Sequence, residues 1–242
     1  MAWYAYCITE QTSLGARFRR PLPIENLRGL GGTPVFAYPS GEFAVIVSPY
    51  VRDGQLQQTA ILDHARVVSE CFRTATVLPF KFGTIFDNDE ALRRSVRANR
   101  KAFMETVSRL RGKAEMHLKL FVRDGWVHTA SDDAALPSTA GGEYLTRLRE
   151  KAFRDRERQS KARTLSVQVH KLFHPLEADV TCKKVDSGGM LIDIAHLIDH
   201  QSLEKYQNRY NSATRQLKGC QLTVSGPWPP YHFMPGNLRQ IS

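Results

Sequence analysis

The stretch Ala114-Glu115-Met116-His117-Leu118-Lys119-Leu120 alternates polar and apolar side chains, as does a strand with one buried face. We expect the elements that follow to be a helix over 143–170, strands over 178–185 and 189–198 joined as a hairpin, a helix over 201–218 and a strand over 220–224. This β-α-β-β-α-β order is that of the ferredoxin-like split βαβ fold. We therefore predict a C-terminal ferredoxin-like domain over 113–242, with an extended Pro/aromatic tail from 226.

Residues 1–112 predict a separate α+β domain, a mixed sheet with two helices. Strands are expected over 2–8, 34–38, 43–47 and 76–86, the middle two forming a hairpin, and 21–33 is expected to be a loop with room for one short helical turn. Apolar side chains recur every three or four residues over 56–75 and over 87–111, so each range predicts one helix. Asp87 or Asn88 is the expected N-cap of the second helix.

The composition is that of a globular protein. The chain has 242 residues, of which 42% are hydrophobic and 24% charged, and its formal net charge is +10. No apolar run approaches the roughly 20 residues that span a bilayer, and the N-terminus lacks a signal-peptide pattern. The four cysteines form no CxxC pair, so we expect reduced thiols in a cytoplasmic protein without membrane contact.

The motifs of common enzymes are incomplete in this sequence. His170/His174 and His196/His200 have the i,i+4 spacing of zinc peptidases, but neither first histidine is followed by the general-base Glu. The glycines of 29–34 resemble a phosphate loop that lacks its lysine, and no Gly-x-Ser-x-Gly elbow occurs. We therefore expect no enzymatic activity, no cofactor, no metal and no small-molecule substrate.

Basic residues gather on two predicted helices. Residues 147–163 contain eight Lys or Arg and three Asp or Glu, and a second basic cluster includes Arg93, Arg97 and Arg100. A solvated helix face and a docking face for an acidic protein are both open interpretations. Residues 81–86 also resemble an RNA-binding strand motif without its second-position glycine, which leaves RNA binding as an alternative function.

The C-terminal tail is the most distinctive segment. Its three prolines favour an extended backbone, so little entropy is lost on ordering. Its large apolar side chains offer a contact surface. Packing of the tail on its own domain is the other interpretation. The candidate partner-binding residues are Trp228, Pro229, Pro230, Tyr231 and Phe233.

Four stretches resemble the gas vesicle protein L/F family. Residues 76–86, containing Pro79, Phe82 and Gly83, match its "VLP-x-[RK]FGT" strand, and residues 112–119, with Glu115, are similar to its "G-x-x-E-x-x-x-K" strand. Tyr144 stands in a "G-x-x-YL" helix start, and Gly226 and Pro227 open a "GPWPPY" motif. The matches run in order from about residue 2 to 233. Met116 stands where the family usually has an aromatic residue.

The resemblance implies a cytoplasmic accessory or minor structural protein of gas vesicles. It also implies two α+β domains, the second a modified ferredoxin fold, and no catalytic activity. The implied partners are the hydrophobic shell protein and other accessory proteins, whereas nucleic acid is not expected.

A shell subunit that excludes water presents a large apolar face, which aggregates when it is left exposed. One hypothesis is that the aromatic tail and the apolar sheet surfaces shield that face during assembly. A second hypothesis gives the basic helix faces this role, toward acidic surfaces of the shell or of sister proteins.

Overall fold

A computed structural model describes residues 1–15, 17–51, 59–122, 140–187, 190–217 and 220–235. The chain divides into two compact units, Met1–Glu115 with Pro227–Ser242, and Met116–Gly226. The predicted boundary at 112 lies close to Glu115. The tail differs from its prediction, because it groups with the first unit and not with the C-terminal domain to which the sequence assigned it.

The first unit contains a six-stranded sheet in the order β2-β3-β4-β1-β5, with β6 also beside β1. Its strands are β1 (Ala2–Glu10), β2 (Leu22–Arg28), β3 (Pro34–Ser40), β4 (Phe43–Tyr50), β5 (Leu78–Pro79) and β6 (Ile85–Phe86). The β3–β4 hairpin confirms its prediction. The pairings of these strands are all antiparallel, whereas the sequence predicted a mixed sheet.

Two strand predictions in this unit were wrong in detail. The predicted loop 21–33 contains β2, whose pairing with β3 shifts register between Pro23 and Arg28, so its apolar residues do not alternate regularly. The predicted strand 76–86 is split into β5 and β6, because Gly83 turns the chain with a φ of +85°. Glycine adopts that conformation without the steric cost that other residues incur.

In the described part of this unit three α-helices accompany the sheet, where two were expected: α1 (Thr59–Phe72), α2 (Asp89–Ala98) and α3 (Arg100–Leu110). The predicted helix 87–111 breaks at Asn99, whose side-chain Nδ2 donates to the carbonyl of Ser95 at 3.0 Å. That bond gives the chain a local alternative to a regular helix turn. Asn88 caps α2 as predicted, since its Oδ1 accepts a hydrogen bond from Ala91 N at 2.9 Å.

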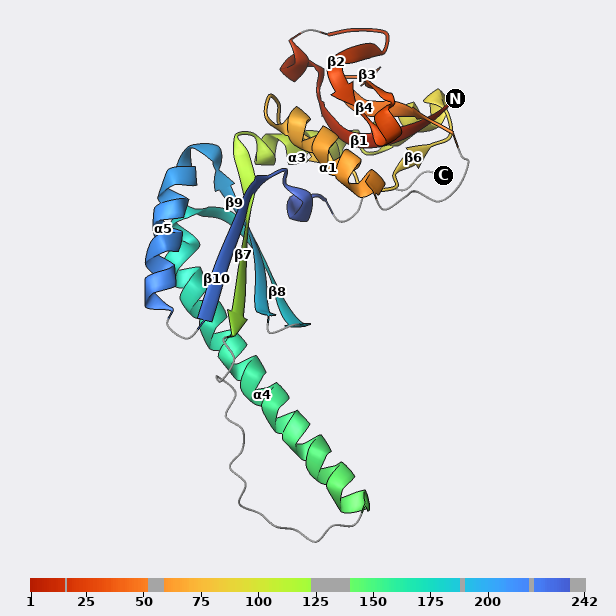
Figure 1. Ribbon diagram of the computed structural model, residues 1–242. Coiled ribbons are helices and arrows are strands. Elements are labelled where there is room, and N and C mark those ends of the chain that lie inside the picture. The colour runs from red at the N-terminus through yellow and green to blue at the C-terminus, as the bar shows by residue number, and fades with distance from the viewer. Residues whose placement is uncertain (16, 52–58, 123–139, 188–189, 218–219, 236–242) are drawn as a thin grey trace. The chain divides into compact units, whose positions relative to one another are not determined.

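The second unit has the predicted β-α-β-β-α-β order. Its elements are β7 (Lys113–Val122), α4 (Ala140–Phe173), β8 (Glu177–Ser187), β9 (Met190–Asp199), α5 (Leu203–Gln216) and β10 (Cys220–Trp228). The strands lie in the order β10-β7-β9-β8, with β8 and β9 antiparallel, which is the ferredoxin-like arrangement (Figure 1). Among the described side chains, buried residues of α4, α5, β7, β9 and β10 form its core, and Val180 of β8 is partly buried against it.

Candidate interaction surface

The tail continues β10 to Trp228 and then folds into a short 3-10 turn, Tyr231–Phe233. Gly226 has a φ of +126°, which other residues rarely adopt. Trp228 is 45% exposed and Tyr231 is 38% exposed. Pro229, Pro230 and Phe233 are buried, so only two of the five candidate residues present an accessible surface. Three of the five candidate residues are thus packed within the first unit, and a partner contact through Trp228 and Tyr231 stays a prediction.

Glu115 binds the middle of this turn. Its carboxylate is buried, and its Oε2 accepts a hydrogen bond from the backbone N–H of His232 at 2.8 Å. Its Oε1 lies 2.8 Å from Nδ1 of the same histidine. A buried carboxylate needs such donors, because removing its charge from water is costly. The glutamate of the second motif thus orders the segment that contains the fourth motif.

Arg109 holds the end of the same turn. From α3, its Nη2 donates a hydrogen bond to the carbonyl oxygen of Phe233. The turn closes internally through Tyr231 N, which donates to the Pro229 carbonyl at 2.8 Å. Burial raises the pKa of Tyr231, and neighbouring Cys7, Tyr4 and Glu115 raise it further. The phenol therefore stays neutral at ordinary pH while part of the ring is accessible.

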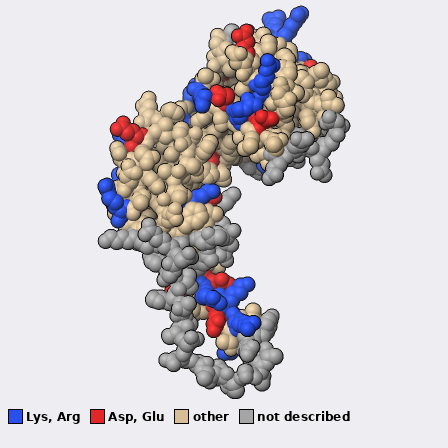
Figure 2. All heavy atoms as spheres, in the orientation of Figure 1, with Lys and Arg blue, Asp and Glu red and all other residues tan. Residues whose placement is uncertain are grey.

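The three arginines proposed on the second predicted helix are all engaged within the first unit. Arg93 Nε donates to Tyr38 Oη at 3.1 Å, and its guanidinium carbon lies 5.5 Å from the centre of that ring. Arg97 pairs with Glu90 at 3.0 Å, and Arg100 pairs with Glu42 at 2.7 Å. Figure 2 shows blue basic and red acidic side chains interspersed on the visible face. The α2 and α3 arginines are therefore partly neutralised by the protein itself.

The strand motif around Gly83 is mainly structural. Pro79 is buried opposite Cys7 in the sheet, and Gly83 N donates to Tyr4 Oη at 3.1 Å. Phe82 is 38% exposed, and its ring packs edge-on against Tyr4 and His64. Tyr144 lies in the first turns of α4, but its side chain is outside the described residues.

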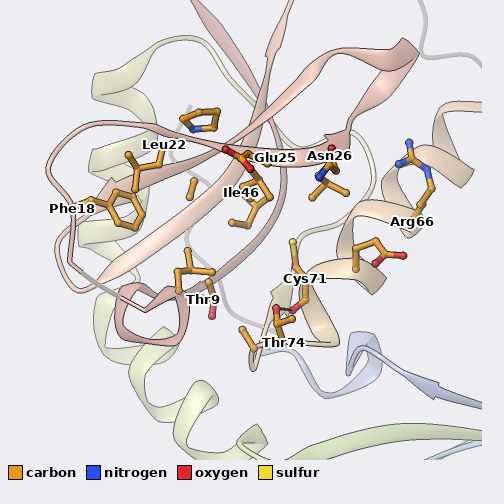
Figure 3. Close-up of a pocket in the computed structure, with 16 residues that line it drawn as sticks. Thr9, Phe18, Leu22, Glu25, Asn26, Ile46, Arg66, Cys71 and Thr74 are labelled. Carbon is orange, nitrogen blue, oxygen red and sulfur yellow. Dashed lines mark hydrogen bonds between the residues drawn. The ribbon is translucent and has the colours of Figure 1, made fainter.

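A cavity of about 610 Å³ in the first unit had no signal in the sequence. It lies between β2 and α1, and its lining is mostly apolar. Figure 3 shows Phe18, Leu22 and Ile46 on the strand and loop side and Arg66 and Cys71 on α1. It forms where the register shift of β2 interrupts its pairing with β3.

The histidines and the glycine loop serve the fold. His196 is buried and bonds Tyr206 Oη through Nδ1 at 2.7 Å, and burial lowers its pKa to about 4. The rings of His170 and His174 stack with centres 5.1 Å apart. Among the described side chains, neither predicted histidine pair gathers a third metal ligand. In the glycine loop, the N–H of Gly31 donates to Asp63 at 3.1 Å, so a carboxylate of the protein occupies this donor.

No helix in the described ranges combines the length and apolarity needed to cross a membrane.

The segment that resembled an RNA-binding strand motif, residues 81–86, does not form such a strand. It forms a turn and the short strand β6, outside the ferredoxin-like unit.

Comparison with known proteins agrees with the four motifs. The family model "Gas vesicle synthesis protein GvpL/GvpF" matches residues 2–235. Gas vesicle protein L of Streptomyces sp. (strain CB03234) is 24% identical over 95% of this chain and 91% of its own. Gas vesicle protein F of the same strain is 24% identical over 97% of this chain and 100% of its own.

Two crystal structures share the fold. GvpF from Anabaena sp. PCC7120 superposes with a TM-score of 0.75 at 16% identity, covering 100% of this chain and 99% of that one. GvpF from Microcystis aeruginosa gives a TM-score of 0.71 at 16% identity, covering 97% and 99%. These matches give no support to an RNA-binding function. With the family model extending over almost the whole chain, this protein belongs to the gas vesicle GvpL/GvpF family.

Proposed function

We propose that this protein acts without catalysis in gas vesicle assembly, by binding the hydrophobic shell protein and other accessory proteins in the cytoplasm. The observation that carries the proposal is the pair of exposed rings, Trp228 at the end of β10 and Tyr231 on the turn that Glu115 and Arg109 hold in place. Aromatic rings bury much apolar area with little loss of rotamer freedom, and such residues dominate protein interfaces.

The geometry supports a preformed site. The turn is ordered by bonds to α3 and β7, and two of its neighbouring prolines are buried. A partner would therefore meet rings that are already positioned, and binding would not have to order a loose tail. A subunit with a large apolar face suits this surface, because contact with the rings removes that face from water.

The test is capture of the purified shell protein by the full chain and by the double variant Trp228→Ala/Tyr231→Ala. We expect capture to fall at least about tenfold, as is typical when central aromatic residues of an interface are truncated. A matched control is Ile61→Ala/Leu62→Ala on α1, which removes two other exposed apolar side chains. The control should bind as the parent does.

Two outcomes would contradict the proposal in different ways. If the parent chain captures no shell protein, the proposed partner is wrong. If the folded double variant captures as well as the parent, the tail is only a structural element of the first unit. Circular dichroism of both variants establishes that they are folded.

A further inference from the structure

The N-terminal half of α4 extends beyond the sheet of its own unit (Figure 1). The part of the helix that packs on the sheet buries Ala162, Leu165, Val169 and Phe173. Further toward the N-terminus the apolar side chains are accessible: Leu145 is 59% exposed, Leu148 is 44% exposed and Phe153 is 65% exposed.

The side of α4 that faces the core changes character along the helix. Arg147 and Leu165 are eighteen residues apart, which is about five helical turns, so they lie on the same side. The same spacing relates Lys151 to Val169. It also relates Asp155 to Phe173, so this side is apolar over the sheet and charged beyond it. The outer half is therefore not patterned to pack against its own unit.

The outer half has a separate apolar stripe with basic flanks. Leu145, Leu148 and Ala152 are spaced three and four residues apart, as are the a and d positions of a coiled coil. Arg149 and Arg156 stand at successive e positions and Lys151 stands at the g position between them, and all three are exposed. Asp155 occupies the next d position, which ends the stripe. The apolar contact is thus short, so the flanking charges decide the partner.

We propose that residues 145–156 form one strand of a heteromeric coiled coil, whose partner is a helix with apolar a and d residues and Asp or Glu at e and g. Opposite charges at e and g select the partner in such pairs. A second copy of this chain would place arginine and lysine against one another, which disfavours self-pairing. This surface is distinct from the Trp228 and Tyr231 rings, so the inference goes beyond the proposed shell contact.

The test uses the full chain and two designed peptides of about four heptads, both with Leu at a and d. One peptide has Glu at e and g, and the other has Lys. We expect the Glu peptide to bind about tenfold more tightly, as three exposed charge pairs would give, and its advantage to shrink with added salt. Fluorescence anisotropy of labelled peptides measures both affinities.

Reversing the charges at the e and g positions should reverse the preference between the two peptides. The variant Arg149→Glu/Lys151→Glu/Arg156→Glu should favour the Lys peptide, and Leu145→Ser/Leu148→Ser should bind neither. The matched control, Lys205→Glu/Arg209→Glu/Arg215→Glu, makes the same change in net charge at exposed positions of α5 and should behave as the parent.

Several results would overturn the proposal. Equal affinity for both peptides would show that the e and g charges do not select the partner. An equal loss of binding in the α5 control would show general attraction to an acidic polymer. Self-association of the parent that the Leu145→Ser/Leu148→Ser variant abolishes would assign the stripe to a homodimer.

Discussion

The carboxylate of Glu115 lies 2.8 Å from both the backbone nitrogen and the ring Nδ1 of His232, although the two residues are 117 positions apart. Together with Arg109, this buried side chain on β7 holds the turn that carries Tyr231 and follows Trp228. Loss of this carboxylate should weaken the attachment of the turn even though no residue of the tail changes.

Glu115→Ala should lower the free energy of unfolding by about 2–3 kcal/mol, the usual contribution of hydrogen bonds to a charged group. Urea denaturation measures the change. Glu105→Ala is the matched control, because Glu105 is exposed on α3 and its ion pair with Lys101 is long, at 3.9 Å. Its effect should stay below about 0.5 kcal/mol. Equal stability of the two variants would show that the Glu115 contacts contribute little.

Gly29→Ala should be destabilising for a steric reason. A Cβ at this position would lie 2.1 Å from Tyr6 Oη, and that hydroxyl also accepts the N–H of Leu30 at 2.9 Å. We expect a cost of about 1–3 kcal/mol, as for other overpacked sites. In the Tyr6→Phe background the same change should cost less than half as much, because the clashing oxygen is gone. Equal costs in both backgrounds, measured by chemical denaturation, would contradict the clash.

Stability should fall as the pH is lowered from about 6.5 to about 4. Burial lowers the pKa of His196 to about 4, so the unfolded chain binds a proton in this window that the folded chain does not. The full stabilisation is present above pH 6.5 and is lost as pH falls, by roughly 3 kcal/mol for this group. Burial lowers the pKa of His64 to about 4 as well, with the same sign.

The measurement is the unfolding free energy from urea titrations at several pH values. His196→Gln should flatten the pH dependence of the second unit. His200→Gln is the control, because that residue is exposed. An unchanged slope in the His196 variant would mean that this buried histidine does not govern acid stability.

Arg93→Ala should be more destabilising than Arg97→Ala, although both arginines are on α2. Arg93 donates to Tyr38, which in turn donates to Asp89 at 2.6 Å, whereas Arg97 pairs with the exposed Glu90. We expect about 1–2 kcal/mol for the first variant and less than about 0.5 kcal/mol for the second. Thermal denaturation of both proteins compares them. A larger loss in the Arg97 variant would contradict this assignment.

Local patterns predicted most of the elements. The alternation over 114–120, the β3–β4 hairpin and the Asn88 cap depend on neighbouring residues, and each was confirmed. Two predictions failed, the single helix over 87–111 and the loop over 21–33. Asn99 interrupts an apolar stripe that continues from α2 into α3, so periodicity alone could not detect the break. In β2 the register shift removes the regular alternation of apolar residues by which a strand is recognised.

By itself, the sequence determined the α+β class, the order of elements in the ferredoxin-like unit and, through four motifs, the family. These depend on the spacing of side chains along the chain. Only the tertiary structure decided which tail residues are accessible, which arginines are already paired and where α4 extends beyond the sheet. Each of these depends on a residue far away in sequence, such as Glu115 for His232 or Glu42 for Arg100, and a pattern of neighbours contains no record of such contacts.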